Sequence, residues 1–220
     1  MNAYTEQPQV IEYFAKELSW LSFNERVLQE AKDKNNPIIE RIRFLGIFSN
    51  NLDEFFRVRV ADVKRRILLN KLPNANFEED EALLSQIQKK VLQLGKKFNL
   101  IHQQILNDLT AHNIHVDRPE ELSEFHLNWL KNYFHDNVLQ HISPILLDEN
   151  KDYSDYINDT MTYLFVEMSD EKSHFAMLEV PTDRVSRFII LPPEKTRRHK
   201  TIVMLDDVIL YFLNDVFSNF

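Results

Sequence analysis

Cysteine is absent from the 220-residue chain, and glycine occurs only twice, at Gly46 and Gly95. The absence of cysteine excludes disulfide bonds, thiolate metal sites and a cysteine nucleophile. The scarcity of glycine excludes the Walker loop and the dinucleotide fingerprint, because both need several glycines within a few residues so that backbone N–H groups can approach phosphate. A nucleotide would therefore have to be bound by side chains or helix ends.

Long apolar runs are missing as well. No stretch approaches 18 uninterrupted apolar residues, so the sequence predicts no membrane-spanning helix. The segment Met1–Val10 carries a glutamate and no apolar run, which argues against a secretory signal. We therefore expect a cytoplasmic protein, with peripheral attachment at the inner face of the membrane left open. The net charge of −8 argues against nucleic acid as a partner.

Periodic apolar residues fill the first half of the chain and predict long helices. A first apolar face is set at helical spacing by Leu18, Leu21, Val27, Leu28 and Ala31. Asn36-Pro37 then predicts a second helix, with Asn36 as the N-cap and Pro37 at the first helical position. We expect this helix to break or kink near Ser49-Asn50-Asn51, because such side chains compete for backbone hydrogen bonds.

A third helix carries the clearest pattern in the sequence, and composition places a loop before it at Lys71–Asn76. Its apolar stripe, at spacings of three and four, consists of Leu84, Ile87, Val91, Leu94, Phe98, Ile101 and Ile105. We expect the core of an antiparallel bundle rather than a dimeric coiled coil, because coiled coils usually sustain more heptads.

The pattern changes after residue 112. We expect a helix over 123–140, strands over 162–168, 174–180, 187–191 and 201–205, and a polar hairpin loop over 169–173. Asp206 or Asp207 is expected to cap a final helix. The sequence thus predicts an α+β fold. Residues 1–112 form an antiparallel helical bundle, and residues 113–220 form a smaller mixed α+β domain with a short, mostly antiparallel sheet.

The predicted final helix, Val208–Phe220, is amphipathic and ends on an aromatic residue. A native terminus is more often polar. We therefore expect the second domain to be truncated at its C-terminus and the chain to be a fragment of a longer protein. We also expect this helix to expose apolar surface and to make the isolated chain self-associate.

The polar run Ser49-Asn50-Asn51 lies inside an otherwise apolar helix and is a candidate functional segment. The competing interpretation is that these asparagines only bond to neighbouring backbone at a kink. The surrounding charge is unusual, since residues 37–72 contain eight basic and four acidic residues. Arg57 and Lys64 lie seven apart, hence on one helix face. They are candidates for binding phosphate, against the alternative of a solvated face with intrahelical ion pairs.

No metal site is predicted. Asp53 and Glu54 are adjacent and diverge on a helix. His112 and His115 would share a face only if a helix continued through them, and no His-Glu-x-x-His array is present. The eight histidines are therefore interpreted as surface or core residues. The basic run Arg197–Lys200 is interpreted as a solvated turn, with contact to an acidic polymer or partner as the alternative.

Five segments resemble bacterial polyphosphate kinases of the histidine-phosphorylating type, the first three their opening and the last two their head domain. These are Glu17–Ala31, Pro37–Arg43, Phe44–Phe55, Tyr163–Pro193 and Leu205–Asp207. The resemblance covers nearly all of the chain and corresponds to the family's N-terminal domain and part of its head domain. It is specific, because runs of a dozen residues are far more informative than a short motif.

The resemblance implies reversible transfer of the terminal phosphate of ATP to polyphosphate through a phosphohistidine. It implies that Asn51, the second asparagine of the Ser-Asn-Asn-Leu-Asp motif, contacts ATP, and that the head domain helps to form a homodimer. In the family, the phosphohistidine, its assisting histidine and the metal-associated arginines belong to two C-terminal domains. We therefore expect no catalytic residue and no magnesium ligand in this chain. The alternative is a non-catalytic module that associates with a full-length kinase.

Overall fold

The computed structural model describes residues 15–69, 77–169, 173–195 and 199–218. The chain divides into two compact units, Met1–Asp108 and Leu109–Phe220. We call them the bundle unit and the head unit. The predicted loop Lys71–Asn76, the tip of the hairpin loop at 170–172, Arg197, Arg198 and Phe220 lie outside the described residues.

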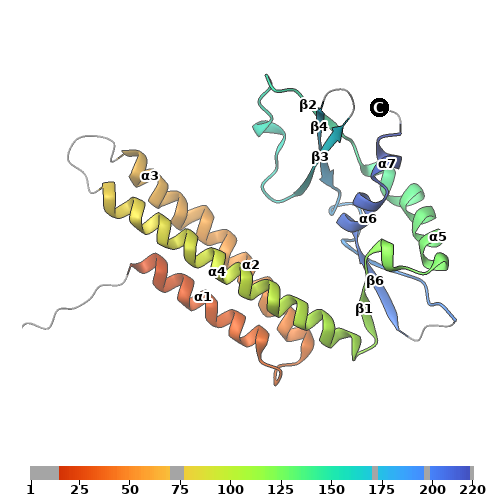
Figure 1. Cartoon of the computed structure of the whole chain (residues 1–220), viewed down its shortest axis with the longest axis horizontal. Coiled ribbons are helices and arrows are strands. Elements are labelled where there is room, and N and C mark those ends of the chain that lie inside the picture. The colour runs from red at the N-terminus through yellow and green to blue at the C-terminus, as the bar shows by residue number, and fades with distance from the viewer. Residues whose placement is uncertain (1–14, 70–76, 170–172, 196–198, 219–220) are drawn as a thin grey trace, which may run out of the picture. The chain divides into compact units, whose positions relative to one another are not determined.

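The bundle unit consists of helices that run side by side (Figure 1). Their bounds are α1 Lys16–Lys32, α2 Ile38–Glu54, the π-helix η1 Phe55–Val60, α3 Ala61–Leu69 and α4 Phe77–Thr110. The apolar stripe predicted for the third helix does face the core, which contains Leu21, Leu28, Ala31, Leu45, Phe48, Phe55, Val60, Val63, Ile87, Leu94, Ile101 and Ile105. The helical-bundle prediction is therefore confirmed.

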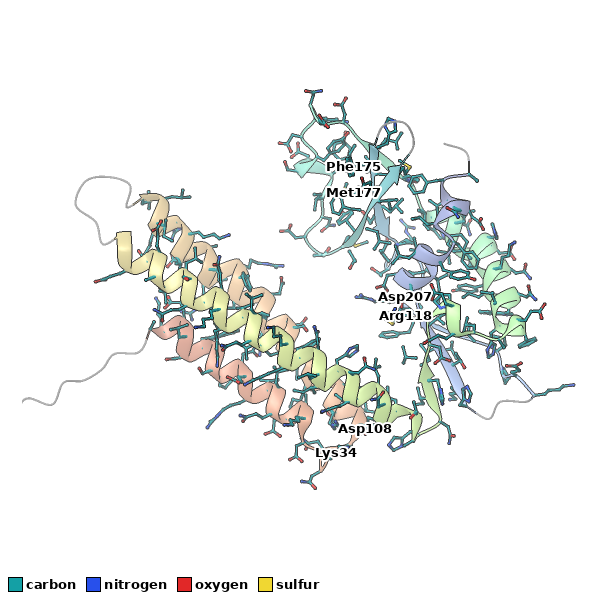
Figure 2. The ribbon with its side chains drawn as sticks, viewed as in Figure 1. Lys34, Asp108, Arg118, Phe175, Met177 and Asp207 are labelled. Atoms are coloured by element: carbon teal, nitrogen blue, oxygen red, sulfur yellow. The ribbon has the colours of Figure 1, made fainter. Side chains whose placement is uncertain are left out.

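A buried arginine holds one end of this bundle together. Arg41 Nε donates to the carbonyl of Ala31 at 2.9 Å, and Nη1 donates to Asp108 Oδ2 at 2.8 Å. Lys34 Nζ also reaches Asp108, at 3.4 Å (Figure 2). Arg41 and then Lys34 hold the pKa of the Asp108 carboxyl below its usual range. One ionic cluster thus joins α1, α2 and α4 where their apolar stripes end.

Two details predicted for α2 were wrong. Pro37, not Asn36, is the N-cap, and its carbonyl accepts the hydrogen bond from the Arg41 N–H at 3.0 Å. Asn36 instead turns back, and its Nδ2 donates to the Glu30 carbonyl at 2.9 Å. The expected break near residues 49–51 is also absent, because α2 runs unbroken to Glu54. The irregular hydrogen bonding begins one residue later, in η1.

The head unit combines helices with two three-stranded sheets. Its longer elements are α5 Glu124–Tyr133, β3 Thr162–Ser169, β4 Ser173–Val180, β6 Lys200–Met204 and α6 Leu205–Tyr211. Its shorter ones are β1 Ile114–Val116, η2 Pro119–Glu121, η3 Phe134–Val138, η4 Leu139–His141, β2 Ile145–Leu147, η5 Ser154–Tyr156, β5 Phe188–Ile190 and α7 Leu213–Val216.

The strand orders are β1-β6-β5 and β2-β4-β3. The β1–β6 pair is parallel, and the other pairs are antiparallel. This arrangement confirms the predicted α+β fold with short, mostly antiparallel sheets. The three-residue strands β1 and β2 were not predicted, because three residues are too few to show an alternating pattern.

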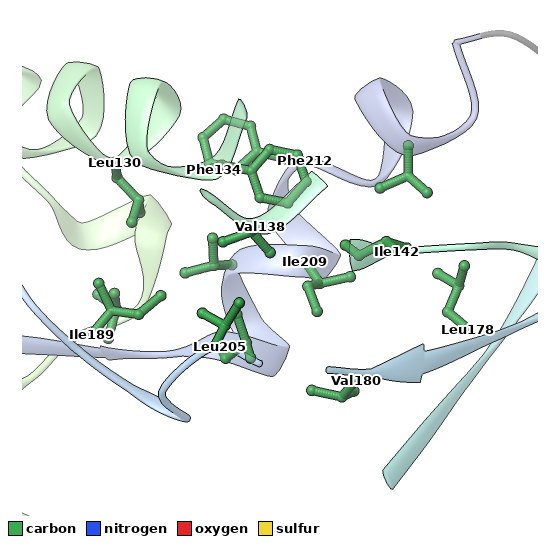
Figure 3. Close-up of a cluster of buried hydrophobic side chains, with 14 of the residues drawn as sticks. Leu130, Phe134, Val138, Ile142, Leu178, Val180, Ile189, Leu205, Ile209 and Phe212 are labelled. Carbon is green, nitrogen blue, oxygen red and sulfur yellow. The ribbon is translucent and has the colours of Figure 1, made fainter. Parts of the chain in front are cut away.

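The final helices are buried in the head unit rather than exposed. Val208 and Ile209 are fully buried, and Phe212 and Val216 are nearly so. Phe212 stacks on Phe134 with ring centroids 4.9 Å apart (Figure 3). The expectation that this segment exposes its apolar side chains is therefore wrong for these four residues, although Leu210 and Tyr211 are exposed. The apolar face of this segment forms part of the head-unit core, to which α5 and η3 also contribute.

The predicted cap of the last helix was wrong as well. Met204 is the N-cap of α6, because β6 leads into the helix without a loop and the Leu205 N–H donates to the carbonyl of Arg187 at 2.9 Å. Asp206 and Asp207 therefore lie within the first turn. Burial and the neighbouring Asp206 raise the pKa of Asp207, while Arg118 opposes this shift (Figure 2).

Candidate functional site

The best-defined polar arrangement in the bundle unit joins Asn51 to a buried asparagine on α1. Asn51 Nδ2 donates to Asn24 Oδ1 at 3.0 Å, and Asn24 Nδ2 donates to the carbonyl of Phe48 at 3.1 Å. Asn24 has no exposed surface, and Asn51 is half-buried. The two amides therefore form a chain of hydrogen bonds that fixes the side chain of Asn51.

Local sequence explains why Asn24 lies there. It follows Leu21 by three residues and precedes Leu28 by four, so the three side chains share the face of α1 that packs on α2. A polar residue on such a face is stable only when its hydrogen bonds are made. Asn24 makes these hydrogen bonds: its side-chain N–H donates to a backbone carbonyl of α2, and its oxygen accepts from Asn51.

The hydrogen bond to Asn24 leaves Asn51 with unused capacity. A carboxamide offers two N–H donors and one oxygen acceptor. One donor points to Asn24, and within the part of the chain that the structure describes no hydrogen bond uses the Asn51 oxygen. A ligand that offers both a donor and an acceptor could pair with this amide. The neighbouring Asn50 and Ser49 are exposed and are not part of the chain of hydrogen bonds.

A second feature lies at the π-helix that follows α2. A cavity of about 460 Å³ is lined by Lys16, Glu17, Arg57, Val58, Arg59, Ala61, Asp62 and Arg65. Four of these side chains are basic and two are acidic, so the lining carries an excess of positive charge. Such π-helical insertions are rare and often mark functional sites. Here the insertion also places buried Phe55 against Trp20, with ring centroids 4.8 Å apart.

Ion pairs use part of this positive charge. Arg57 pairs with Asp53 at 3.0 Å, and Arg65 pairs with Asp62 at 2.6 Å. Hydrogen bonding from Arg65 is the main reason that the pKa of Asp62 is lowered. Among the described residues, Arg59 has no ion-pair partner. The cavity can therefore offer at least one guanidinium to an anion without breaking an existing pair.

The structure separates the two basic residues that the sequence placed together. Arg57 lines the cavity, whereas Lys64 is exposed and is not among its lining residues. The prediction assumed α-helical spacing, but η1 intervenes from Phe55 to Val60 and changes the number of residues per turn. Only Arg57 of the two therefore lines the cavity, and a shared helix face for the pair stays a prediction. Asn51 does not line this cavity either.

One cluster in the head unit was missed by sequence reasoning. His115, Asp117 and His199 bring three side-chain ligand atoms within 4.8 Å of one another. The two histidines were interpreted separately, because they are far apart in the sequence. The alternation His115-x-Asp117 was the available signal, since a strand places both side chains on one face.

Comparison with known proteins gives consistent matches across both units. The family model of the polyphosphate kinase N-terminal domain matches residues 13–116, and that of the polyphosphate kinase middle domain matches residues 126–220. The polyphosphate kinases of Vibrio vulnificus (strain YJ016) and Escherichia coli (strain K12) are 47% and 46% identical over 209 residues. Each alignment covers 94% of this chain and 30% of the relative.

A solved structure agrees with the sequence matches. The crystal structure of polyphosphate kinase from Porphyromonas gingivalis superposes with a TM-score of 0.77 at 34% identity. The match covers 92% of this chain and 31% of that one. Fold and sequence thus define a chain built from two known domain families, an N-terminal domain and a middle domain. The chain belongs to the polyphosphate kinase family. It spans about 30% of the length of these curated relatives.

Proposed function

We propose that this chain is the ATP-side segment of a polyphosphate kinase, which reversibly transfers the terminal phosphate of ATP to polyphosphate through a phosphohistidine. The observation that carries the proposal is the Asn51 side chain, held by buried Asn24 with its oxygen available to a ligand. The family match over both units supports the reaction class.

In this proposal, Asn51 recognises ATP directly. Its oxygen can accept a hydrogen bond and its second N–H group can donate one, which suits a base edge or a hydroxyl group. The hydrogen bond to Asn24 reduces the rotational freedom of the amide before the nucleotide binds. Less entropy is then lost on binding, which improves affinity without any additional contact.

The basic cavity beside η1 is the proposed phosphate-side surface of the bundle unit. Arg57 and Arg59 present guanidinium groups, whose planar geometry suits bidentate contact with phosphate oxygens. Lys64 lies outside the cavity lining and would contribute only longer-range attraction. Because these residues are exposed, we expect their effect to weaken as ionic strength rises.

Magnesium accompanies ATP in this proposal. However, the carboxylates that follow Asn51 in the sequence, Asp53 and Glu54, are poorly suited to bind it. Magnesium prefers several oxygen ligands in octahedral geometry. Asp53 and Glu54 are adjacent on α2 and diverge, and Asp53 is already paired with Arg57. We therefore place the magnesium ligands, like the phosphohistidine, outside this chain. The chain alone is then expected to make no polyphosphate.

The head unit is the proposed dimerisation element, in keeping with its exposed apolar side chains. Phe165 on β3 is 67% exposed, Phe188 on β5 is 58% exposed and Ile190 is 64% exposed. Neighbouring exposed apolar side chains, such as Phe188 and Ile190 on one face of β5, are typical of interaction surfaces. In the part of the chain that the structure describes, no helix is long and apolar enough to cross a bilayer. We propose a cytoplasmic location, where ATP is found, with peripheral membrane contact left to experiment.

The test of the ATP proposal is Asn51→Ala in the complete enzyme that carries this segment. Loss of one or two hydrogen bonds of about 1 kcal/mol each should raise the KM for ATP roughly tenfold. Since binding rather than chemistry is affected, kcat should change little. Polyphosphate synthesis from labelled ATP, measured across ATP concentrations, gives both constants.

Asn50→Ala is the matched control, because Asn50 is the same residue type on the same helix but is exposed. It should leave both constants at their wild-type values. An unchanged KM in Asn51→Ala would reject the proposed role of Asn51, and equal effects of both substitutions would show that the helix rather than the amide was disturbed.

A further inference from the structure

The head unit contains a group of metal-ligating side chains unrelated to the proposed ATP site. His115 lies in β1, Asp117 follows β1 directly, and His199 directly precedes β6. Their ligand atoms lie within 4.8 Å of one another. We propose that these three residues bind a divalent transition-metal ion of the Zn²⁺ class.

Strand geometry places the three side chains together. β1 and β6 run parallel and side by side, with His115 opposite Thr201 (Figure 1). Asp117 is two residues after His115, and His199 is two residues before Thr201. Because side chains alternate between the two faces of a sheet, all four lie on one face. Backbone hydrogen bonds extend the pairing at both ends, from the Asp117 N–H to Ile202 and from the Lys200 N–H to Asn113.

This face of the sheet points toward the head-unit core. Val203, the next residue of β6 on the same face, is completely buried. His115, Asp117 and His199 are half-buried, so they lie at the margin of the core and not in open solvent. The imidazole rings of His115 and His199 are stacked, with centroids 3.9 Å apart. Two imidazoles and a carboxylate are thus held together by a sheet rather than by a loop alone.

A buried hydroxyl group provides independent support. Thr201 is 2% exposed, and its Oγ1 has no hydrogen-bond partner among the described residues. A buried polar atom without a partner is costly and calls for an explanation. A bound ion that keeps one water would supply a partner at this position. Outer hydrogen bonds of this kind commonly orient the ligands of metal sites.

The donor set decides the class of ion. Two imidazole nitrogens and one carboxylate oxygen suit Zn²⁺ and similar transition metals, whereas Mg²⁺ and Ca²⁺ prefer oxygen ligands throughout. Bonds of about 2.0–2.1 Å place two ligand atoms at most about 4.2 Å apart. Small side-chain rotations would therefore close the present arrangement on an ion. Three protein ligands leave a fourth position for water.

Such an ion would join β1 to β6 across a long stretch of sequence. It binds only the folded head unit, so it should stabilise that unit by mass action. At a zinc concentration about 100-fold above the dissociation constant, we expect the melting temperature of the head unit to rise by about 5 °C or more. Magnesium at the same concentration should give no rise.

The experiment titrates Zn²⁺ into the metal-free 220-residue chain by calorimetry, with the visible absorption of Co²⁺ as a second probe of coordination. We expect one ion per chain and nitrogen-containing coordination in the Co²⁺ spectrum. His115→Ala and His199→Ala should each weaken binding at least about 100-fold, and Thr201→Val about tenfold. Asp117→Asn keeps the shape of the side chain and should also weaken binding, which separates ligation from folding.

His141→Ala is the matched control, because His141 is an exposed histidine of the same unit outside the cluster. It should bind Zn²⁺ like the wild type. The proposal is overturned if the chain binds no Zn²⁺ at micromolar concentrations. It is also overturned if folded variants at residues 115, 117 and 199 retain wild-type affinity, or if His141→Ala weakens binding as much as they do.

Discussion

Asn24 shows how a buried polar residue can affect ligand binding by positioning a neighbouring side chain, here that of Asn51. Its side chain is enclosed between α1 and α2, where an apolar residue would pack without any hydrogen-bond requirement. Its side-chain nitrogen donates to the α2 backbone and its side-chain oxygen accepts from Asn51, so both polar atoms of the amide have a partner. Asn24 is therefore a positioning residue in our account, whereas Asn51 is the proposed contact to ATP.

Replacing Asn24 with alanine should affect both stability and ATP binding. The change leaves the Phe48 carbonyl with one hydrogen bond fewer and frees the Asn51 side chain to rotate. We expect the free energy of unfolding of the bundle unit to fall by about 1–3 kcal/mol. In the complete enzyme, the KM for ATP should rise several-fold with kcat nearly unchanged. Urea denaturation and steady-state kinetics measure the two effects.

Leu21→Ala separates positioning from general loss of stability. Leu21 is fully buried on the same face of α1, and no hydrogen bond connects its side chain to Asn51. Its truncation should cost about 2–5 kcal/mol and leave the ATP KM of the folded enzyme unchanged. If Leu21→Ala raised the KM as much as Asn24→Ala, the positioning role of Asn24 would be ruled out.

At the scale of elements, α1 and α4 are joined by a carboxylate shared between two lysines. Glu25 accepts hydrogen bonds from Lys90 and from Lys97. These two bonds, Lys90 first, lower the pKa of Glu25 below its ordinary value of 4.5. A carboxyl group whose pKa is lower in the folded state stabilises that state above its ordinary pKa, and this stability is lost as the pH falls through the lowered value.

Glu25→Gln should therefore change the pH profile of the bundle unit. At pH 7 we expect the variant to be less stable by about 1 kcal/mol, since Glu25 forms two partly exposed ion pairs. The difference should shrink below pH 4.5 and vanish in strong acid, where wild-type Glu25 is protonated. Urea midpoints measured between pH 3 and pH 7 test this convergence.

Glu54→Gln provides the comparison, because Glu54 is exposed and forms no ion pair among the described residues. Its pH profile should be parallel to that of the wild type. A constant offset between Glu25→Gln and wild type at every pH would contradict the assigned ion pairs.

Sequence patterns predicted some elements and not others for identifiable reasons. The stripe of α4 and the apolar, β-branched and aromatic runs of β3 and β4 are long enough to indicate their structure, and the structure confirms them. The π-helix η1 changes the hydrogen-bond pattern without changing the apolar composition, so no sequence signal marked it. Caps were misplaced by one or two residues because a neighbouring proline or strand fixed where the helix begins.

The candidate sites differ in how many of their residues could be predicted from the sequence. Asn51 could be singled out, because it interrupts an apolar helix within a recognisable motif. Asn24 left a weaker signal, an asparagine between Leu21 and Leu28 on the buried face of α1. The cluster of His115, Asp117 and His199 depends on a parallel strand pair that the sequence did not predict. Such a pairing of distant segments becomes visible only in three dimensions.

At the scale of the whole molecule, the chain consists of two compact units. Its alignment covers about 30% of the length of the curated relatives. Each unit has its own buried core. The proposed functions are divided between the same two units: the bundle unit contacts ATP, and the head unit forms the dimer. We propose that phosphoryl transfer itself depends on domains that correspond to the remainder of the relatives.

The most direct test is a structure of the complete enzyme with a non-hydrolysable ATP analogue. Our account predicts that the carboxamide of Asn51 lies within hydrogen-bond distance of the nucleotide, about 2.7–3.2 Å, while Asn24 still accepts from Asn51. A nucleotide bound at full occupancy without any contact to Asn51 would contradict the account.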